Sequence, residues 1–300
     1  MSAGEVLDGR WHVEARIAEG GMGAVYRARE PALDRQVAIK FLMPGRVSHR
    51  AAVERFLAEA RQTAALRHPN IVAIHAVGER HGTPFMVMEF LDGEPLDRRI
   101  ARGPLPPSEV LSIVRQVVSA LELLRSKGLV HRDIKPGNIV VDARGHATLL
   151  DFGLSRKQVR DEGGLTAAGV VVGTPGYLAP ERALGTAEID HRSDLFSIGL
   201  VTFELLTGRR AITAEHPAAL LGKQLTAPVL DPRAVRPELP EALEAFFARA
   251  CAQAPAARFQ DGAEFLAGLE LALGAQPGEP GPGRRWWPIA AGAAAAAALT

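Results

Sequence analysis

The sequence predicts an α+β chain with two lobes, in which a small β-rich lobe with one main helix precedes a larger helical lobe. Its 300 residues, 47% hydrophobic and 23% charged, suffice for two apolar cores. Short β-type runs dominate the predicted N-lobe at 11–90, whereas helical periodicity dominates the predicted C-lobe at 91–273. Both lobes form one predicted domain at 11–273, which follows a short tail at 1–10.

Composition excludes several classes of protein. Lys and Arg number 35 against 34 acidic residues, a net charge of +1, so nothing marks the chain as a nucleic-acid binder. Cys251 is the single cysteine, which excludes an internal disulfide and a cysteine zinc cluster and fits a reducing compartment. Charged residues interrupt any apolar run near the amino terminus, so we expect no signal peptide and a cytoplasmic amino end.

The N-lobe is predicted from five β-type runs and one helix. The helix covers 51–67, because apolar residues recur at spacings of three and four and form one stripe that can face a sheet. His68-Pro69-Asn70 then ends it. The β-type runs occupy 12–17, 25–29, 36–41, 71–77 and 85–90.

The C-lobe is predicted from helical patterns. Residues 109–127 carry a wide apolar face and stop at Gly128. Residues 193–207 are apolar on nearly every side, which predicts a central buried helix in which Asp194 needs a partner. Two further helices are predicted at 240–253 and 261–273.

A glycine cluster, Ile-Ala-Glu-Gly-Gly-Met-Gly-Ala-Val at 17–25, lies between two strand patterns. Glycine lets a backbone approach phosphates closely and donate N–H groups to them. No helical pattern follows Gly23, unlike in a dinucleotide-binding turn, and the chain has no GxxxxGK[ST] loop. By itself the cluster is equally consistent with a flexible hairpin tip.

Two charged clusters point more strongly to chemistry. Lys40 ends an alternating strand; alone it is typical of a solvated charge, but Glu59 on the following helix could hold it toward nucleotide phosphates. Residues 131–138 read His-Arg-Asp-Ile-Lys-Pro-Gly-Asn, and Asp-Phe-Gly begins at Asp151. A charged turn between a helix and a hairpin would not require this order of residues.

With these motifs in order, the chain resembles eukaryotic-like (Hanks-type) protein kinases, and specifically the bacterial transmembrane serine/threonine kinases. The resemblance covers 11–273 and implies the two-lobed protein kinase fold. It implies transfer of the γ-phosphate of ATP to Ser and Thr hydroxyls of proteins in signal transduction. ATP and Mg²⁺, with Mn²⁺ as a second option, are the implied cofactors.

The resemblance assigns roles to the charged residues. Asp133 accepts the proton of the attacking hydroxyl, and Lys135 contacts the transferring phosphate. Lys40, paired with Glu59, completes the implied catalytic set. The implied metal ligands are Asn138 and Asp151.

The resemblance also implies an adenine pocket. Met88 guards its back, and Glu89 to Leu91 form the hinge that binds adenine through the backbone. The apolar roof is Ile17, Val25 and Ala38. The phosphate-covering loop comprises Ile17, Ala18, Glu19, Gly20, Gly21, Met22, Gly23, Ala24 and Val25. Ala18 stands at the first glycine position of the pattern, a small change with which we expect ATP binding to survive.

The activation segment closes with Ala179-Pro180-Glu181, where Glu181 is expected to pair with Arg258, and Asp194 is expected to anchor the catalytic loop. Lys135 and the Gly173-Thr174-Pro175 stretch favour Ser/Thr over Tyr specificity by the same resemblance.

Phosphorylation of the activation loop has one main candidate. Ala168 and Val170 replace threonines that related kinases often carry, which leaves Thr166, since Thr174 is expected to be structural and substrate-positioning. Arg132 is placed either to receive a loop phosphate or to be satisfied by backbone carbonyls.

The tail has its own pattern. A Pro/Gly-rich linker at 274–285 ends in Arg284-Arg285, and 286–300 is an uncharged, alanine-rich run that starts with two tryptophans. The run is shorter than the roughly 20 residues of a membrane span, so we expect the truncated start of one. A weak surface anchor or disordered end is the alternative. The expected location is a cytoplasmic kinase domain anchored to the bacterial inner membrane by a single C-terminal helix.

Two other functions are alternatives. A pseudokinase scaffold would bind nucleotide without turnover, but every catalytic position considered is intact. A small-molecule phosphotransferase would not need the complete segment at 151–181. The expected partners are protein substrates and the membrane, with autophosphorylation and homodimerisation, and no nucleic acid.

Overall fold

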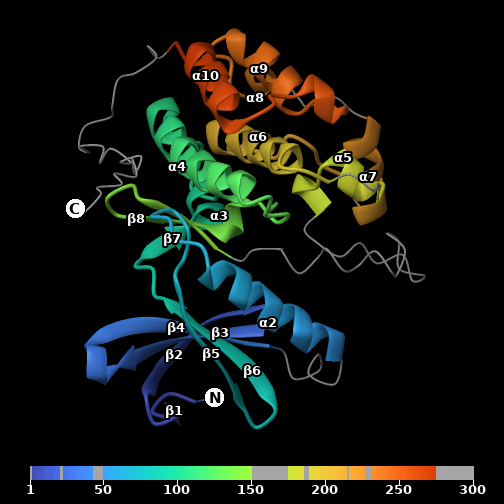
Figure 1. Cartoon of the computed structure of the whole chain (residues 1–300). Coiled ribbons are helices and arrows are strands. Elements are labelled where there is room, and N and C mark those ends of the chain that lie inside the picture. Colours follow the sequence, from blue (N-terminus) through green and yellow to red (C-terminus); the bar gives the residue numbers. More distant parts are fainter. Residues whose placement is uncertain are drawn as a thin grey trace, which may run out of the picture.

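The computed structural model has two lobes, with the N-lobe below and the C-lobe above in Figure 1. It describes residues 2–20, 23–42, 50–150, 175–185, 189–214, 216–226 and 231–274.

The N-lobe is one six-stranded antiparallel sheet with the order β1-β2-β3-β4-β6-β5. Its strands are β1 (Val6–Leu7), β2 (Trp11–Gly20), β3 (Gly23–Glu30), β4 (Arg35–Leu42), β5 (Ile74–Arg80) and β6 (Thr83–Glu89). The sheet thus begins before residue 11, because Leu7 is fully buried and pairs with Trp11. Phe41 and Phe85 pack in the same apolar cluster, which holds the strands together.

Helix α2 (Arg50–Ala64) lies along one side of this sheet, as Figure 1 shows. It ends three residues before the predicted position. The predicted strand at 71–77 is also displaced, since β5 starts at Ile74. Ile71 instead bridges to Leu149, and the Val72 amide donates to the Leu149 carbonyl at 3.1 Å. This segment therefore ties the N-lobe to the hairpin below the C-lobe.

That hairpin consists of β8 (Ile139–Asp142) and β9 (Ala147–Leu149). With β7 (Gly93–Pro95) it forms a three-stranded sheet in the order β7-β8-β9. Asn70 crosses to it from the N-lobe, because its side-chain amide donates to the Ala147 carbonyl at 2.7 Å and to Gln116 at 3.0 Å. The chain between the lobes is fixed by these bonds on the side of β9.

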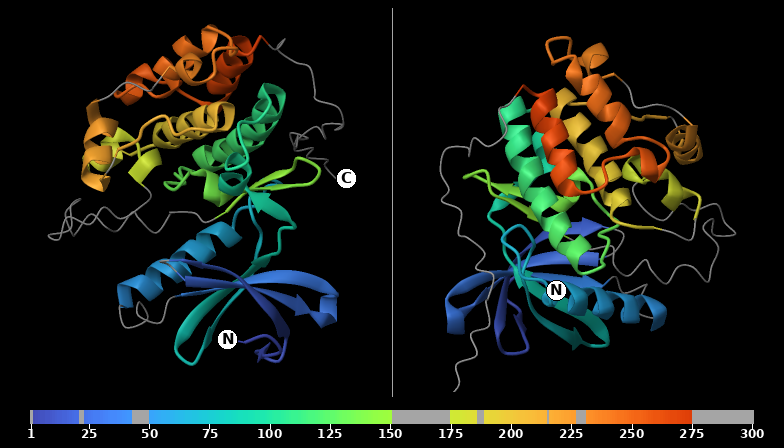
Figure 2. Two further views of the ribbon diagram at one scale, coloured as in Figure 1. Left: turned by 180° about the vertical axis from the view of Figure 1, so that it is seen from behind. Right: turned by 45° about the horizontal axis from the view of Figure 1, so that its top comes forward.

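The C-lobe is built around α6 (Arg192–Thr207), in which every residue from Ser193 to Thr207 is buried. This confirms the central helix predicted from its apolar composition. Its larger neighbours are α4 (Pro107–Ser126) and α9 (Ala242–Ala250), and α10 (Gly262–Ala272) packs against both of these helices (Figure 2). The shorter elements are α3 (Leu96–Ile100), α5 (Pro180–Ala183), α7 (Pro217–Thr226), α8 (Pro232–Val235) and the 3₁₀ turns η1 (Pro31–Leu33), η2 (Pro136–Asn138), η4 (Pro175–Tyr177) and η5 (Pro255–Ala257).

Cys251 lies in the C-lobe core beyond α9, and burial raises the pKa of its thiol to about 12. Within the described part of the chain, no helix has the length and apolar character needed to cross a membrane. The expected linker and membrane segment, 275–300, lie outside the described residues.

Candidate active site

The loop at 131–138 connects α4 to β8 and is fixed from the C-lobe core. The buried Asp194 carboxylate accepts the backbone N–H of His131 at 2.6 Å and that of Arg132 at 2.9 Å. Burial raises the pKa of Asp194, while the nearby His131 and these amide bonds act in the opposite direction. The partner that Asp194 needs is therefore the backbone of this loop.

Within the loop, the side chain of Asp133 is held by two donors. Lys135 Nζ lies 2.9 Å from Asp133 Oδ2, and Asn138 Nδ2 donates to the same oxygen at 2.9 Å. The imidazole of His131 accepts the Asp133 amide through Nδ1 at 3.2 Å, so its Nε2 carries the hydrogen donated to Leu150. The carboxylate of Asp133 is thus oriented by both lysine and asparagine.

Arg132 takes a left-handed backbone conformation, with φ of 69°, at the bend of this loop. Its carbonyl accepts a hydrogen bond from the guanidinium of Arg182. Arg182, which the sequence motifs do not single out, therefore joins the loop at 131–138 to α5. Arg132 itself is buried, and the residues of the activation loop that could face it, including Thr166 and Thr174, lie outside the described residues.

The chemistry of Asn138 suits a hard cation. Its amide nitrogen is committed to the carbonyl and carboxylate of Asp133, at 2.8 and 2.9 Å, which leaves the amide oxygen as a ligand of the kind that Mg²⁺ prefers. The second implied ligand, Asp151, lies outside the described residues. Within the described ranges, no group of three His, Cys, Asp or Glu side chains is placed to hold a metal on its own.

The strand register places the predicted nucleotide-binding residues on adjacent strands. Val25 pairs with Lys40, and Ala38 pairs with Met88. Val25, Ala38, Met88 and Leu91 belong to one apolar cluster, and Lys40 is buried beside it on β4. The structure therefore assembles an apolar surface next to a buried lysine, which is the chemistry that a flat base with attached phosphates requires.

The glycine cluster forms the tip of the β2–β3 hairpin, where Gly20 pairs with Gly23. A Cβ at Gly23 would lie 1.8 Å from the carbonyl oxygen of Phe41, so only glycine fits there. Ile17 is 42% exposed on β2, which leaves it outside the apolar cluster of the described side chains. Ala18, Glu19 and Ala24 lie in these two strands, and Glu89 ends β6; Gly21 and Met22 lie outside the described residues.

Of the expected Lys40–Glu59 pair, only the Lys40 side chain belongs to the described structure. Glu59 is a residue of α2, but its side chain lies outside the described part.

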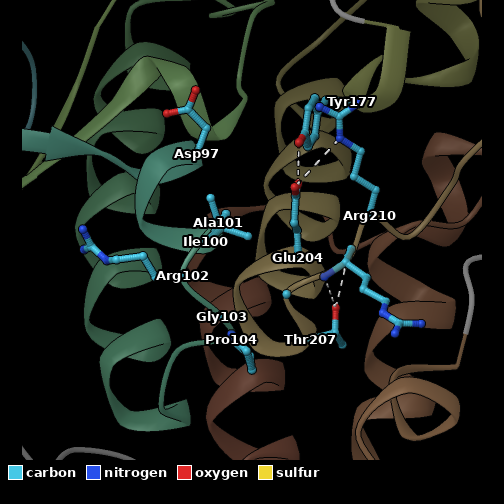
Figure 3. Close-up of a pocket in the computed structure, with 12 residues that line it drawn as sticks. Asp97, Ile100, Ala101, Arg102, Gly103, Pro104, Tyr177, Glu204, Thr207 and Arg210 are labelled. Carbon is cyan, nitrogen blue, oxygen red and sulfur yellow. Dashed lines mark hydrogen bonds and ion pairs between the residues drawn. The ribbon is translucent and has the colours of Figure 1, made fainter.

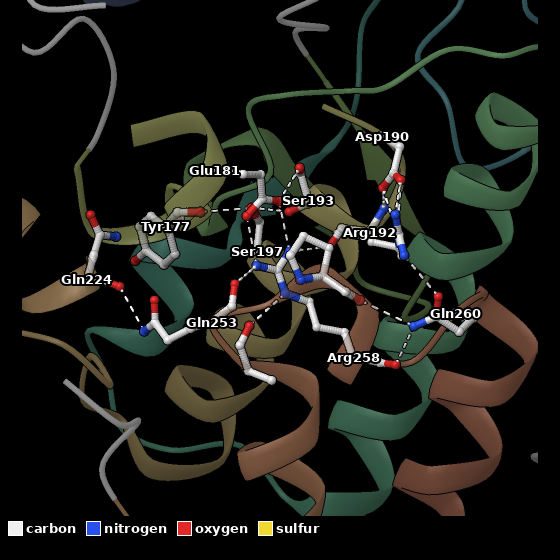
Figure 4. Close-up of polar contacts among 12 residues, drawn as sticks. Tyr177, Glu181, Asp190, Arg192, Ser193, Ser197, Gln224, Gln253, Arg258 and Gln260 are labelled. Atoms are coloured by element: carbon white, nitrogen blue, oxygen red, sulfur yellow. Dashed lines mark hydrogen bonds and ion pairs between the residues drawn. The ribbon is translucent and has the colours of Figure 1, made fainter. Parts of the chain in front are cut away.

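A buried polar network in the C-lobe joins α5 to α6 and to the segment that carries Arg258, as Figure 4 shows. Arg258 pairs bidentately with Glu181 at 2.7 and 2.8 Å, the ion pair expected from the sequence. Ser193 donates to the same carboxylate at 2.5 Å. Although burial alone would raise it, the pKa of Glu181 is lowered by the hydrogen bonds from Arg258 and Ser193.

A second carboxylate in α6 was not predicted from the sequence. Glu204 is buried and accepts the hydroxyl hydrogen of Tyr177, which lies two residues before Ala179-Pro180-Glu181. Burial raises the pKa of both groups. The available signal was a charged residue inside an otherwise apolar helix, the same signal that identified Asp194.

The fold and this site define a class of two-lobed proteins that combine a glycine-rich β-hairpin in the N-lobe with an Asp–Lys–Asn loop in the C-lobe. The sequence profile of the protein kinase domain matches residues 11–261. The chain therefore belongs to the protein kinase family.

Several relatives are named serine/threonine-protein kinases. PksC of Streptomyces coelicolor is 41% identical over 86% of this chain and 48% of its own length. PknL and PknA of Mycobacterium tuberculosis are 37% and 36% identical, over 88% and 94% of this chain and 66% of their own lengths. The chain thus spans from about half to about two thirds of these relatives.

Solved structures agree with the fold. The crystal structure of the PknI kinase domain of M. tuberculosis matches with a TM-score of 0.72 and 29% identity, over 92% of this chain and all of that chain. A point mutant of the same domain matches with a TM-score of 0.71 at 28% identity, over 91% of this chain and 98% of that chain.

Proposed function

We propose that this chain is an ATP- and Mg²⁺-dependent protein serine/threonine kinase. The observation that carries the proposal is the geometry around Asp133, whose carboxylate is oriented by Lys135 and Asn138 on a loop fixed by Asp194. The serine/threonine kinase names of its relatives support the same activity.

The residues of the chain would act mainly by positioning and charge neutralisation. Asp133 orients the substrate hydroxyl and accepts its proton, and Lys135 lies close enough to stabilise the transferring phosphate. Lys40 binds the phosphates from β4. When bound, Mg²⁺–ATP supplies the phosphoryl group and the cationic charge on it, held by the oxygen atoms of Asn138 and Asp151.

The remaining assignments extend this proposal. Thr166 is the proposed site of loop autophosphorylation, and homodimerisation would serve phosphorylation between copies. The run at 286–300 is the proposed start of a single membrane helix, with Arg284-Arg285 on the cytoplasmic side of the inner membrane.

Transfer of labelled phosphate from ATP to a generic protein acceptor tests the activity. Asp133→Asn and Lys40→Met should each reduce the rate by about 100-fold or more, because each removes a group from the reacting centre. The exposed residues Asp34 and Lys127 provide matched controls, and Asp34→Asn and Lys127→Met should leave the rate unchanged.

Unchanged transfer by both active-site variants would contradict the proposal. Thermal stabilisation by Mg²⁺–ATP without any transfer by the wild-type chain would instead support a pseudokinase. Mass spectrometry of the same reactions reports Thr166, where an active enzyme without phosphate on this residue would exclude the loop role.

A further inference from the structure

A cavity of about 570 Å³ opens on the C-lobe between α3 and the carboxyl end of α6 (Figure 3). Its charged and hydroxyl-bearing side chains include Asp97, Arg102, Tyr177, Glu204, Arg209 and Arg210. One wall lies beside the catalytic loop, because a Cβ at Gly137 would come within 3.4 Å of the Asp97 carboxylate. Tyr177 on the opposite wall lies near the end of the activation segment, two residues before Ala179. A peptide bound at Asp133 therefore passes near this cavity.

The buried carboxylate in the cavity is already engaged. Glu204 accepts the Tyr177 hydroxyl hydrogen, and Arg210 Nε lies 3.9 Å from its other oxygen. The guanidinium carbon of Arg210 also lies 5.6 Å from the centre of the Tyr177 ring. Arg210 is the more exposed partner of this pair, since its side chain is 49% exposed and that of Glu204 is 11% exposed.

The guanidinium groups of Arg209 and Arg210 are less committed. The Arg210 side chain is 49% exposed, and its ion pair with Glu204 is at the distance limit for such a contact. Arg209 is exposed, and its side chain has no hydrogen bond or ion pair with any described residue. Arg102, the third arginine of the cavity, differs because both its terminal nitrogens bind Glu94.

The turn that carries these two arginines is held in place. Gly208 ends α6 with φ of 71° and donates to the Glu204 carbonyl at 2.8 Å. The Thr207 hydroxyl accepts the Arg209 amide hydrogen at 3.2 Å. Leu105, after the facing turn, donates to the Leu205 carbonyl at 2.8 Å. Because these bonds fix the turn, the Cα atoms of Arg209 and Arg210 hold a constant position at the edge of the cavity.

We propose that Arg209 and Arg210 make this cavity a specificity pocket for an anionic side chain, a carboxylate or a phosphate, that flanks the phosphoacceptor residue of the protein substrate. The inference rests on the proposed kinase function. Arginine forks suit both anions, since each can bind two oxygens in parallel. Binding of the anion to Arg210 would cost the folded protein little stability, because the contact between Arg210 and Glu204 is long. Since the cavity does not touch the reacting atoms, the effect falls on KM rather than on kcat.

Positional-scanning peptides test this proposal. Each position around a central Ser or Thr carries Asp, phosphoserine, Ala or Lys in turn, and kcat/KM is measured for each peptide. At one or two positions, Asp or phosphoserine should raise kcat/KM about tenfold over Ala by lowering KM, the scale of a hydrogen bond to a charged group. The comparison between Asp and phosphoserine distinguishes the two sources of charge.

Variants of Arg210 connect the preference to the cavity. Arg210→Ala should remove it, Arg210→Lys should retain part of it, and Arg210→Glu should shift it toward Lys peptides. Arg125 is an exposed C-lobe arginine paired only locally with Glu122, so Arg125→Ala is the control for loss of one positive charge and should keep the preference.

Fluorescence anisotropy of the labelled peptides separates this inference from the kinase proposal. Selective binding of the acidic peptide without phosphate transfer would overturn the kinase function and support the pocket. Equal kcat/KM for Asp, Ala and Lys peptides, a preference for Lys, or an acidic preference that survives in Arg210→Ala would each overturn the pocket.

Discussion

Two carboxylate–arginine pairs lie close together in the C-lobe, and they differ in almost every physical respect. Arg258 and Glu181 are both buried, with side chains 0% and 9% exposed, and they form two short parallel hydrogen bonds. Arg210 is 49% exposed and lies 3.9 Å from Glu204, which takes its closest hydrogen bond from Tyr177 instead.

The difference concerns how much bonding capacity each arginine has left. Besides Glu181, the Arg258 guanidinium donates to three backbone carbonyls and packs over the Phe196 ring at 4.7 Å. Those carbonyls belong to Arg192, Ala252 and Gln253. Arg210 keeps half of its surface toward solvent. We infer that the Arg258–Glu181 pair, called the closed pair below, stabilises the fold. The Arg210–Glu204 pair, called the open pair, leaves Arg210 able to bind another partner.

The largest expected effect breaks the closed pair. Arg258→Ala should lower the free energy of unfolding by about 3–5 kcal/mol, because it leaves the Glu181 carboxylate buried without its countercharge. Equilibrium urea unfolding measures this change. Arg258→Lys, which keeps the charge but loses the bidentate geometry, should fall between wild type and Arg258→Ala. A loss below about 1 kcal/mol in Arg258→Ala would show that the pair behaves as a surface contact.

An effect of intermediate size is expected in the pH dependence of stability, where Glu181 and Glu204 should act in opposite directions. The pKa of Glu181 is lowered below its ordinary value of 4.5, so its stabilisation is complete above that pH and is lost as the pH falls through the folded-state pKa. Burial raises the pKa of Glu204, so ionisation of this group costs stability at neutral pH, and the cost disappears as the pH falls.

The measurement is urea unfolding of Glu181→Gln and Glu204→Gln between pH 3 and pH 8, each compared with wild type. As the pH falls, the advantage of wild type over Glu181→Gln should shrink, whereas wild type should gain relative to Glu204→Gln. Parallel pH profiles for the two variants would contradict the assigned difference between the pairs.

The smallest expected effect comes from the open pair. Arg210→Ala should change the free energy of unfolding by less than about 1 kcal/mol, because a half-exposed ion pair at 3.9 Å is screened by solvent. Urea unfolding alongside Arg125→Ala, which removes a comparable exposed arginine, provides the reference. A loss of several kcal/mol in Arg210→Ala alone would mean that the cavity wall depends on this side chain.

Sequence patterns predicted those parts of the fold that depend on residues close together in the chain. The apolar character of α6 and the stripe of α4 determine their burial, since both follow from residues within a single helix. The predicted strand at 71–77 was displaced because Ile71 and Val72 bond to β9, and that contact joins residues more than 70 positions apart. No local pattern reports such a partner.

The same distinction applies to the site. The resemblance in residues 131–138 identified Asp133, Lys135 and Asn138, which the structure brings together within one turn. Glu204 was missed because its role depends on Tyr177, 27 residues earlier, and on the end of α6. Its charge in an apolar helix was visible, but the cavity that gives the charge meaning exists only after folding.

The burial of Cys251 has a practical consequence for spectroscopy. Its sulfur is packed so closely that a Cβ at Gly199 would lie 3.0 Å away, and its pKa of about 12 keeps it protonated at neutral pH. Maleimide dyes should therefore bypass it in the native state. The natural chain then serves directly as a background for single introduced cysteines, one in each lobe, with which energy transfer can compare the separation of the lobes with and without Mg²⁺–ATP.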